Sequence, residues 1–227
     1  MKYQDRFFIG KNRRPKTILH EGLNGKLLIA ATPWGSSDPL KDFFETIEGF
    51  LSSALADADS TSPYGMLDCV DSLTNQLRVS LLLANERFYR SVNSVEYFSG
   101  IEVLILMQNN RQLSWAKVGG IGMALQNSQQ KLNTISMSAS LDMEFSKDRT
   151  LPQLPVDTVG LNSSCNLQFG SLLLQDSDQI LLFSGVDVLR PLFCEESLNF
   201  DLNQVTQKII KQEVNSSFWL AHVNPFN

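Results

Sequence analysis

The 227-residue sequence has few of the residues that build disulfide frameworks and zinc sites. Cysteine occurs only three times, as Cys69, Cys165 and Cys194, and histidine occurs twice. The cysteine count is odd and no two cysteines form a CxxC pair, which argues against a disulfide scaffold and against a zinc site. Free cysteines favour a reducing compartment, so we expect a cytoplasmic protein.

Long apolar runs and an excess of positive charge are also missing. No segment approaches the ~20 uninterrupted apolar residues of a membrane span, and the opening "MKYQDRFFIG" lacks the apolar stretch of a signal peptide. The net charge is −5, whereas nucleic-acid-binding domains usually carry a basic face. We interpret the one dense basic cluster, "KNRRPK" at 11–16, as a solvated loop. We therefore expect neither a membrane span nor a nucleic-acid partner.

Several catalytic motifs are absent as well. The chain has no G-x-S-x-G nucleophile elbow and no G-x-x-x-x-G-K-[ST] phosphate-binding loop. Amidohydrolases with an N-terminal nucleophile also use a layered αββα sandwich, but Met1, Lys2 and Tyr3 offer no threonine, serine or cysteine for that role. These absences exclude the commonest hydrolase signatures.

What is present fits one globular domain over residues 1–227, because 43% of the residues are hydrophobic. Strands are predicted over residues 3–10 and 25–31. Asp38 can cap a helix that has Pro39 at its first position, and apolar residues then recur at helical spacing up to Leu55. A second long helix is predicted over residues 67–92, and "TPWGSSDP" before the first helix reads as a turn.

From Gly100 onward the period changes to that of strands. "GIEVLILMQ", "QLSWAKVG", "GMALQN" and "KLNTISM" predict a meander, with a glycine-rich hairpin turn at Gly119, Gly120 and Gly122. That turn could also hold an anion on its backbone amides. Two strands around an Asp178 turn, a helix over 198–214 and a closing strand "SSFWLAHV" complete the pattern. Segregated strands and helices favour an α+β fold of two antiparallel sheets with helices outside them.

Seven segments in this order resemble the metal-dependent protein phosphatase family, type 2C. "YQDRFFIG" resembles the family's opening strand, "GKLLIAATPWG" falls where the family has A-D-G-x-G-G, and "LLLANERFYRS" resembles its second helix. "SGIEVLILM" falls at A-G-T-T, "LSWAKVGGIG" at V-G-D-S-R, "DSDQILLFSGV" at G-D-x-L-L-L-x-S-D-G-V, and "NSSFWLAHV" at the last D-N or D-D. The resemblance implies a four-layer αββα sandwich, in which aspartates hold two manganese or magnesium ions and a bridging water attacks a phosphoserine or phosphothreonine.

Nearly all of these aspartates are replaced in this chain. The resemblance places the degenerate site positions at Gln4, Asp5, Ala31, Thr32, Gly120, Ser184, Gly185, Asn215 and Ser216. Only Asp5 retains a carboxylate. It is either a remnant metal ligand or a strand-end carboxylate paired with Arg6 or with backbone. One carboxylate cannot hold two divalent cations, so we expect no metal cofactor and no catalytic residue.

The resemblance therefore predicts a pseudophosphatase rather than an enzyme, acting in signalling as a regulatory or scaffolding protein-binding module. Its partner would be a kinase, a phosphoprotein or an assembly component, bound at the rim of the old site. Trp34 is a possible interface residue, since exposed aromatics often anchor interfaces, although it could equally be core. The alternative is an active serine/threonine phosphatase with a remodelled manganese or magnesium site. A small-ligand sensor is a third hypothesis, and no residue set specifies its ligand.

Overall fold

The computed structural model describes residues 1–36, 38–56, 63–137, 153–185, 192, 201–212 and 215–226. The chain forms two compact units, each assembled from separate stretches of sequence. Unit 1 comprises Met1–Thr17, Gly120–Val156 and Gln175–Asn227, and unit 2 comprises Ile18–Gly119 and Asp157–Leu174.

Unit 2 is built on a five-stranded antiparallel sheet with the order β2-β3-β4-β5-β8. Its strands are β2 Ile18–Gly22, β3 Leu27–Gly35, β4 Ser99–Asn109, β5 Gln112–Val118 and β8 Gln168–Leu173, with a 3₁₀ turn at Leu23–Gly25. The central strand β4 is buried on both faces over most of its length. This explains why its sequence is a continuous apolar run rather than an alternating one.

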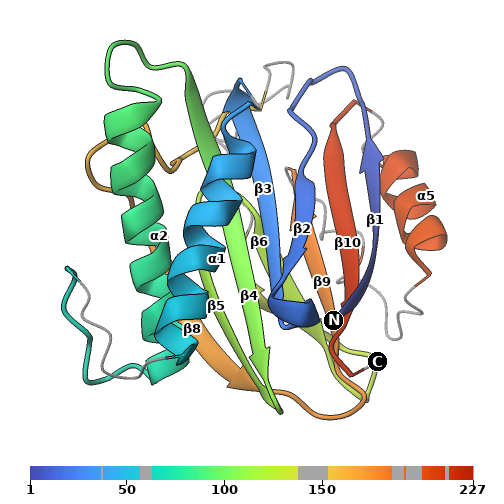
Figure 1. The fold of residues 1–227 in the computed structure, drawn as a ribbon. Helices are drawn as coiled ribbons and strands as arrows, with labels where there is room; N and C mark the ends of the chain where they lie inside the picture. Colours follow the sequence, from blue (N-terminus) through green and yellow to red (C-terminus); the bar gives the residue numbers. More distant parts are fainter. Residues whose placement is uncertain are drawn as a thin grey trace. The chain divides into compact units, whose positions relative to one another are not determined.

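Two helices, α1 Leu40–Ala56 and α2 Ser72–Ser91, lie side by side on one face of this sheet (Figure 1). The Asp71 carboxylate caps α2 by accepting a hydrogen bond from the Thr74 amide at 3.0 Å. Phe43, Ile47 and Leu51 of α1 pack with Leu77, Leu81 and Phe88 of α2 against alternate residues of the sheet. Each large apolar side chain buried in this way stabilises the fold by about 1.5–3 kcal/mol.

Unit 1 contains a second five-stranded antiparallel sheet with the order β1-β10-β9-β6-β7. Its strands are β1 Lys2–Phe8, β6 Gly122–Gln126, β7 Leu132–Ser136, β9 Gln179–Ser184 and β10 Phe218–Asn224. Helix α5, Leu202–Gln212, packs beside β1 and β10 (Figure 1). Its buried residues Leu202, Val205 and Ile209 form a core with Phe183, Phe218 and Leu220.

Most elements expected from the sequence are found, with shifted ends. The strand expected to stop at Ala31 continues as β3 to Gly35, so Trp34 lies on a strand and not in a turn. Helix α2 begins at Ser72 rather than near Leu67, because Asp71 caps it there. Strand β2 was not expected from its sequence, ILHEG, which is short and half polar.

The hairpin expected at Gly119, Gly120 and Gly122 is wrong. Strand β5 pairs with β4 on one side and with β8 on the other, so it has no free edge for β6. Strand β6 pairs instead with β7 and β9 in the sheet of unit 1. The glycines therefore mark the point where the chain leaves one sheet for the other. Within the described residues, no helix is both long and apolar enough to cross a membrane.

Candidate functional site

The one retained carboxylate, Asp5, accepts a hydrogen bond from a buried indole. Asp5 lies opposite Ala221 on β10, and Trp219 precedes Ala221 by two residues, so the two side chains share a face of the sheet. The Nε1 atom of Trp219 donates to Oδ2 of Asp5 at 3.1 Å, and Trp219 is fully buried. Arg6 does not pair with this carboxylate, because its guanidinium donates to the backbone oxygen of Asp5 and to Asn203.

Gln4 points to the opposite face of the same strand. Its register partner is His222, and its side chain is exposed, whereas that of Asp5 is half-buried. Arg6, two residues along the strand from Gln4, contacts Asn203 of α5, which identifies this face as the helix side. Gln4 and Asp5 therefore cannot serve one site.

Ser184 lies on the same face as Asp5 and Trp219. It ends β9 directly opposite Trp219, and its hydroxyl oxygen is 3.3 Å from that of Thr17. Both hydroxyls are fully buried. Gly185 follows with φ of +124°, a conformation that favours glycine. Of the two positions that the resemblance aligns with a metal-binding aspartate, Ser184 thus has a hydroxyl beside the Thr17 hydroxyl, and Gly185 has no side chain.

Ser216 and Asn215 lie where the chain enters β10, and their partners are also neutral. Ser216 forms a parallel bridge with Asn12, and the backbone oxygen of Asn215 accepts from the Asn12 amide at 3.0 Å. A Cβ atom on Gly10 would lie 2.4 Å from that same oxygen, so the first segment passes too close for any side chain. Asn215 itself is exposed, and Ser216 is buried.

Arg14 contributes a buried positive charge to this end of unit 1. The arginine was expected in a solvated loop, but only 8% of it is exposed, so that interpretation is wrong for this residue. Its Nη1 donates to Oε1 of Gln153 at 3.3 Å, and Nε2 of Gln153 donates to the Ser217 carbonyl at 2.9 Å. The Ser217 hydroxyl accepts from the Gly10 amide at 2.9 Å. These hydrogen bonds link the buried guanidinium, through the Gln153 amide, to the backbone at Ser217 just before β10.

In unit 2, the two candidate positions Ala31 and Thr32 point to opposite faces of the sheet. Ala31 packs in the core beneath α1 and α2, so the side chain of Thr32 is on the other face of the sheet. Thr32 is fully buried and lies directly opposite Glu102 of β4. The carboxylate on this face therefore belongs to Glu102.

Glu102 and Lys117 form a buried acid–base pair that the sequence did not lead us to predict. Glu102 is 1% exposed and Lys117 is 2% exposed. Lys117 lies opposite Leu104 of β4, two residues from Glu102, and thus on the same face. Burial lowers the pKa of Lys117 to about 8, and the nearby Glu102 carboxylate opposes that shift. The signal was a lone charge within each of two apolar strands, GIEVLILM and LSWAKVG.

Trp34 donates a hydrogen bond to Glu102. Its Nε1 lies 2.9 Å from Oε2 of Glu102, and the indole is half-buried. Gly119 lies next to the Glu102 side chain and has φ of +87°. A Cβ atom on it would lie 2.7 Å from Cγ of Glu102 and 2.5 Å from the backbone oxygen of Asp157. Close packing explains this glycine. Gly120, where the family has an aspartate, is buried between β5 and β6.

These residues do not fit a pair of divalent cations. Hard cations such as manganese and magnesium take several oxygen ligands, mostly carboxylates. Threonine, glycine and serine occupy the matching positions, and Asp5 is engaged by an indole. Over the part of the chain that the structure describes, no three histidine, cysteine, aspartate or glutamate side chains cluster closely enough to hold a metal. Asp142 and Asp187, two further acids that could in principle rebuild a site, lie outside the described residues. So do Cys194 and most of the loop 147–155, which the sequence offers as a possible contact surface.

No protein-family model matches the sequence, and no curated protein matches it either. Solved structures do match. PppA, a key regulatory component of T6SS in Pseudomonas aeruginosa, is 15% identical with a TM-score of 0.60, and the match covers 97% of this chain and 96% of that one. The serine/threonine phosphatase PstP/Ppp of Mycobacterium tuberculosis is 15% identical with a TM-score of 0.59 and 97% coverage of both chains. The serine/threonine phosphatase of S. agalactiae is 17% identical, with a TM-score of 0.61 over 97% of this chain and 98% of that one.

The match extends over almost the whole chain, and the two antiparallel sheets with their helices agree with the α+β class expected from the sequence. At these identities the similarity establishes the fold and leaves the chemistry to be argued from the residues. The chain has the fold of the PPM-type, or type 2C, serine/threonine phosphatases.

Proposed function

We propose that the protein is a catalytically inactive phosphatase-like domain, a cytoplasmic pseudophosphatase that acts as a regulatory or scaffolding protein-binding module. One observation carries the proposal. The expected metal-binding positions carry hydroxyl groups, or a carboxylate that is already hydrogen-bonded, in place of a cluster of carboxylates. In unit 1, Asp5 accepts from Trp219, and the Ser184 hydroxyl lies beside that of Thr17. In unit 2, Thr32 lies opposite Glu102.

The buried cations Arg14 and Lys117 support the same interpretation. A metal centre needs surplus negative charge, because the ligands must offset two divalent ions. In this chain, each unit instead buries a cationic side chain near the positions that lost their aspartates. Glu102, a buried carboxylate that the sequence did not lead us to expect, faces Lys117 and accepts a hydrogen bond from Trp34. Its carboxylate therefore already has a cation nearby and a hydrogen-bond donor within the protein.

The kind of partner follows from what the fold retains. A phosphatase framework without metals still offers a folded surface, so the partner we propose is a protein: a kinase, a phosphoprotein or an assembly component. PppA is a regulatory component of T6SS, which supports a regulatory role for a chain of this fold. Trp34 remains our candidate for the interface, because part of its side chain is exposed.

Turnover of an aryl phosphate in excess manganese or magnesium tests the proposal. We expect no turnover above buffer by the wild type. Asp5→Asn is the matched variant, because its amide oxygen can still accept from Trp219 while it removes the only matching carboxylate. Metal-dependent turnover that Asp5→Asn abolishes would instead establish the alternative, an active phosphatase with a remodelled metal site.

A further inference from the structure

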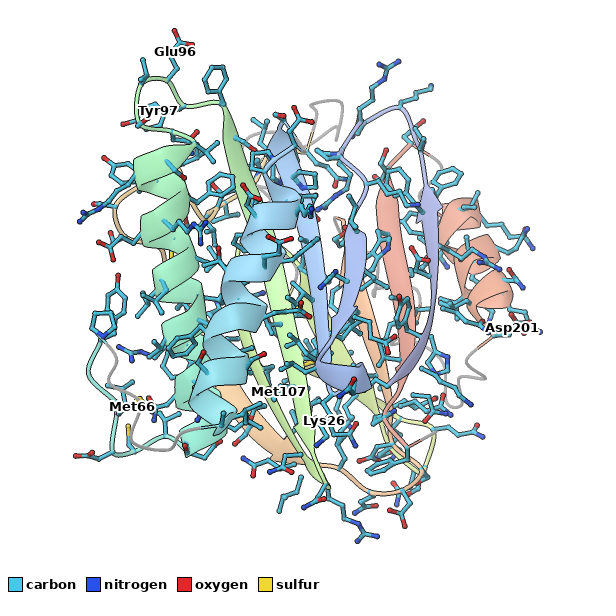
Figure 2. The ribbon with its side chains drawn as sticks, viewed as in Figure 1. Lys26, Met66, Glu96, Tyr97, Met107 and Asp201 are labelled. Carbon is cyan, nitrogen blue, oxygen red and sulfur yellow. The ribbon has the colours of Figure 1, made fainter. Side chains whose placement is uncertain are left out.

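The loop between α2 and β4 presents three large apolar side chains to solvent. Val95 is 90% exposed, Tyr97 71% and Phe98 59%. Glu96 lies among them and is exposed as well. Figure 2 shows Glu96 and Tyr97 on the loop that projects beyond the end of α2. We call residues 95–98 the apolar knob.

The knob is held in a fixed conformation by the buried side chain of Asn93. Its Nδ2 donates to the backbone oxygens of Ser99 at 2.8 Å and Gly160 at 2.7 Å, and its Oδ1 accepts from the amides of Phe98 at 2.8 Å and Ser99 at 3.2 Å. These four hydrogen bonds to one buried amide group fix the backbone at Phe98 and Ser99, next to the exposed aromatic side chains. Such pre-organisation lowers the entropic cost of binding.

A cavity lies next to the knob, between α1 and α2. Its volume is about 140 Å³, and Phe43, Ala84, Phe88 and Val92 contribute its apolar lining while Asp42 and Arg87 contribute charged groups. The size compares with an engineered cavity of ~150 Å³ that binds benzene, so one aromatic ring fits. Val92 lines the cavity and Asn93 starts the loop, so knob and cavity are neighbours on unit 2.

The charges beside the two features are complementary. Arg87 borders the cavity and is exposed, and its guanidinium has no hydrogen bond or ion pair with any residue that the structure describes. Glu96 in the knob is likewise exposed, and its carboxylate has no such partner among these residues. An aromatic side chain with a flanking acid thus matches the α2 side of the apolar cavity, where Arg87 lies, while Asp42 lies on the α1 side.

We propose that this surface of unit 2 binds a second copy of the chain, with the apolar knob of each copy in the α1–α2 cavity of the other. A knob and a cavity side by side on one surface satisfy the condition for a two-fold interface, in which the same patch occurs on both subunits. Glu96 of one copy then pairs with Arg87 of the other. Aromatic and arginine side chains at the centre of the patch are those that dominate interface energies. This inference does not depend on whether the domain is catalytic.

Sedimentation velocity of the full chain over a range of concentrations tests the proposal. We expect a concentration-dependent dimer in the wild type. Tyr97→Ser combined with Phe98→Ser weakens it at least ~10-fold, and so does Arg87→Glu alone or Glu96→Arg alone. The pair Arg87→Glu with Glu96→Arg restores the dimer, because the salt bridge reforms with its charges exchanged. All the changed side chains are exposed, and unchanged circular dichroism verifies the fold.

Leu173→Ser is the matched control. Leu173 is 80% exposed on β8 of the same unit, and its replacement should leave the dimer intact. Three results would overturn the proposal: a monomer at every concentration, a dimer that the knob variants leave unchanged, or a dimer broken by Leu173→Ser, which would indicate pairing through the edge strand β8.

Discussion

Trp219 donates its indole N–H to the carboxylate of Asp5 across the β1–β10 pair at 3.1 Å. Trp34 does the same to Glu102 across the β3–β4 pair at 2.9 Å. In each sheet, the carboxylate nearest the expected metal-binding positions is therefore a hydrogen-bond acceptor for a tryptophan. This use of the two carboxylates leads to predictions that separate a structural role from a ligand role.

Replacing Asp5 should affect stability according to what the new side chain can accept. Asp5→Ala leaves the Trp219 indole N–H without its carboxylate, and a buried donor that loses its partner costs about 1–3 kcal/mol. Asp5→Asn retains an oxygen acceptor and should cost less. Urea denaturation of the three proteins measures the difference. Equal losses for alanine and asparagine would contradict the structural role, because a ligand or charge role does not distinguish them.

The Glu102–Lys117 pair should show strong coupling. Glu102→Leu leaves a buried ammonium and Lys117→Met leaves a buried carboxylate, and breaking a buried pair in this way costs about 3–5 kcal/mol. The double variant removes both charges and should be more stable than either single variant. A double-mutant cycle on free energies of unfolding tests this. Additive losses would show that the two charges do not interact.

Lys117 should also make stability depend on pH. Its pKa is about 8 in the folded protein against 10.5 ordinarily, so between these values the unfolded chain binds more protons than the folded one. The free energy of unfolding therefore rises as pH increases through this window, by up to about 3 kcal/mol from this group. The charged lysine destabilises the fold below pH 8, and Lys117→Met should lack the rise.

A second buried group acts with the opposite sign at higher pH. Burial raises the pKa of the Cys165 thiol to about 12 from 9.0, so the folded state holds its proton longer and stability falls as pH rises through that range. Because the Cys165 titration overlaps that of Lys117, the measurement compares Cys165→Ala with the double variant Cys165→Ala, Lys117→Met. Parallel pH profiles for the two proteins would show that Lys117 carries no such linkage.

Regular elements were predictable where one face of the segment is buried. The apolar residues Phe43, Ile47 and Leu51 recur at helical spacing and form the inner face of α1. The apolar run from Ile101 to Met107 could be identified as a strand because both of its faces are buried. Hydrophobic periodicity reveals an element when the same face or faces stay buried along its whole length, as in these two elements.

Pairing between strands was not predictable from local pattern. Glycines after β5 suggest a hairpin, but whether a strand has a free edge depends on β8, which is contributed from fifty residues further along the chain. Half-polar β2 gives no periodic signal, although it occupies an edge of its sheet.

The degenerate positions came from the family resemblance and stay a prediction, and the buried residues around them were only partly detectable. Alignment with family motifs left alternatives at each end, such as Ser184 or Gly185, and the structure places Asp5 and Ser184 on one face of one sheet. Arg14 could not be found, since a buried arginine and a solvated one look alike in "KNRRPK". Glu102 and Lys117 were detectable as single charges within apolar strands, because a charge inside such a run needs a partner.

Titration of manganese into the wild-type protein by calorimetry tests the loss of the metal centre most directly. We predict no binding heat beyond dilution, because the described residues supply one matching carboxylate and Trp219 engages it. Tight binding of two ions per chain, abolished by Asp5→Asn, would contradict this prediction and show that other carboxylates rebuild the site.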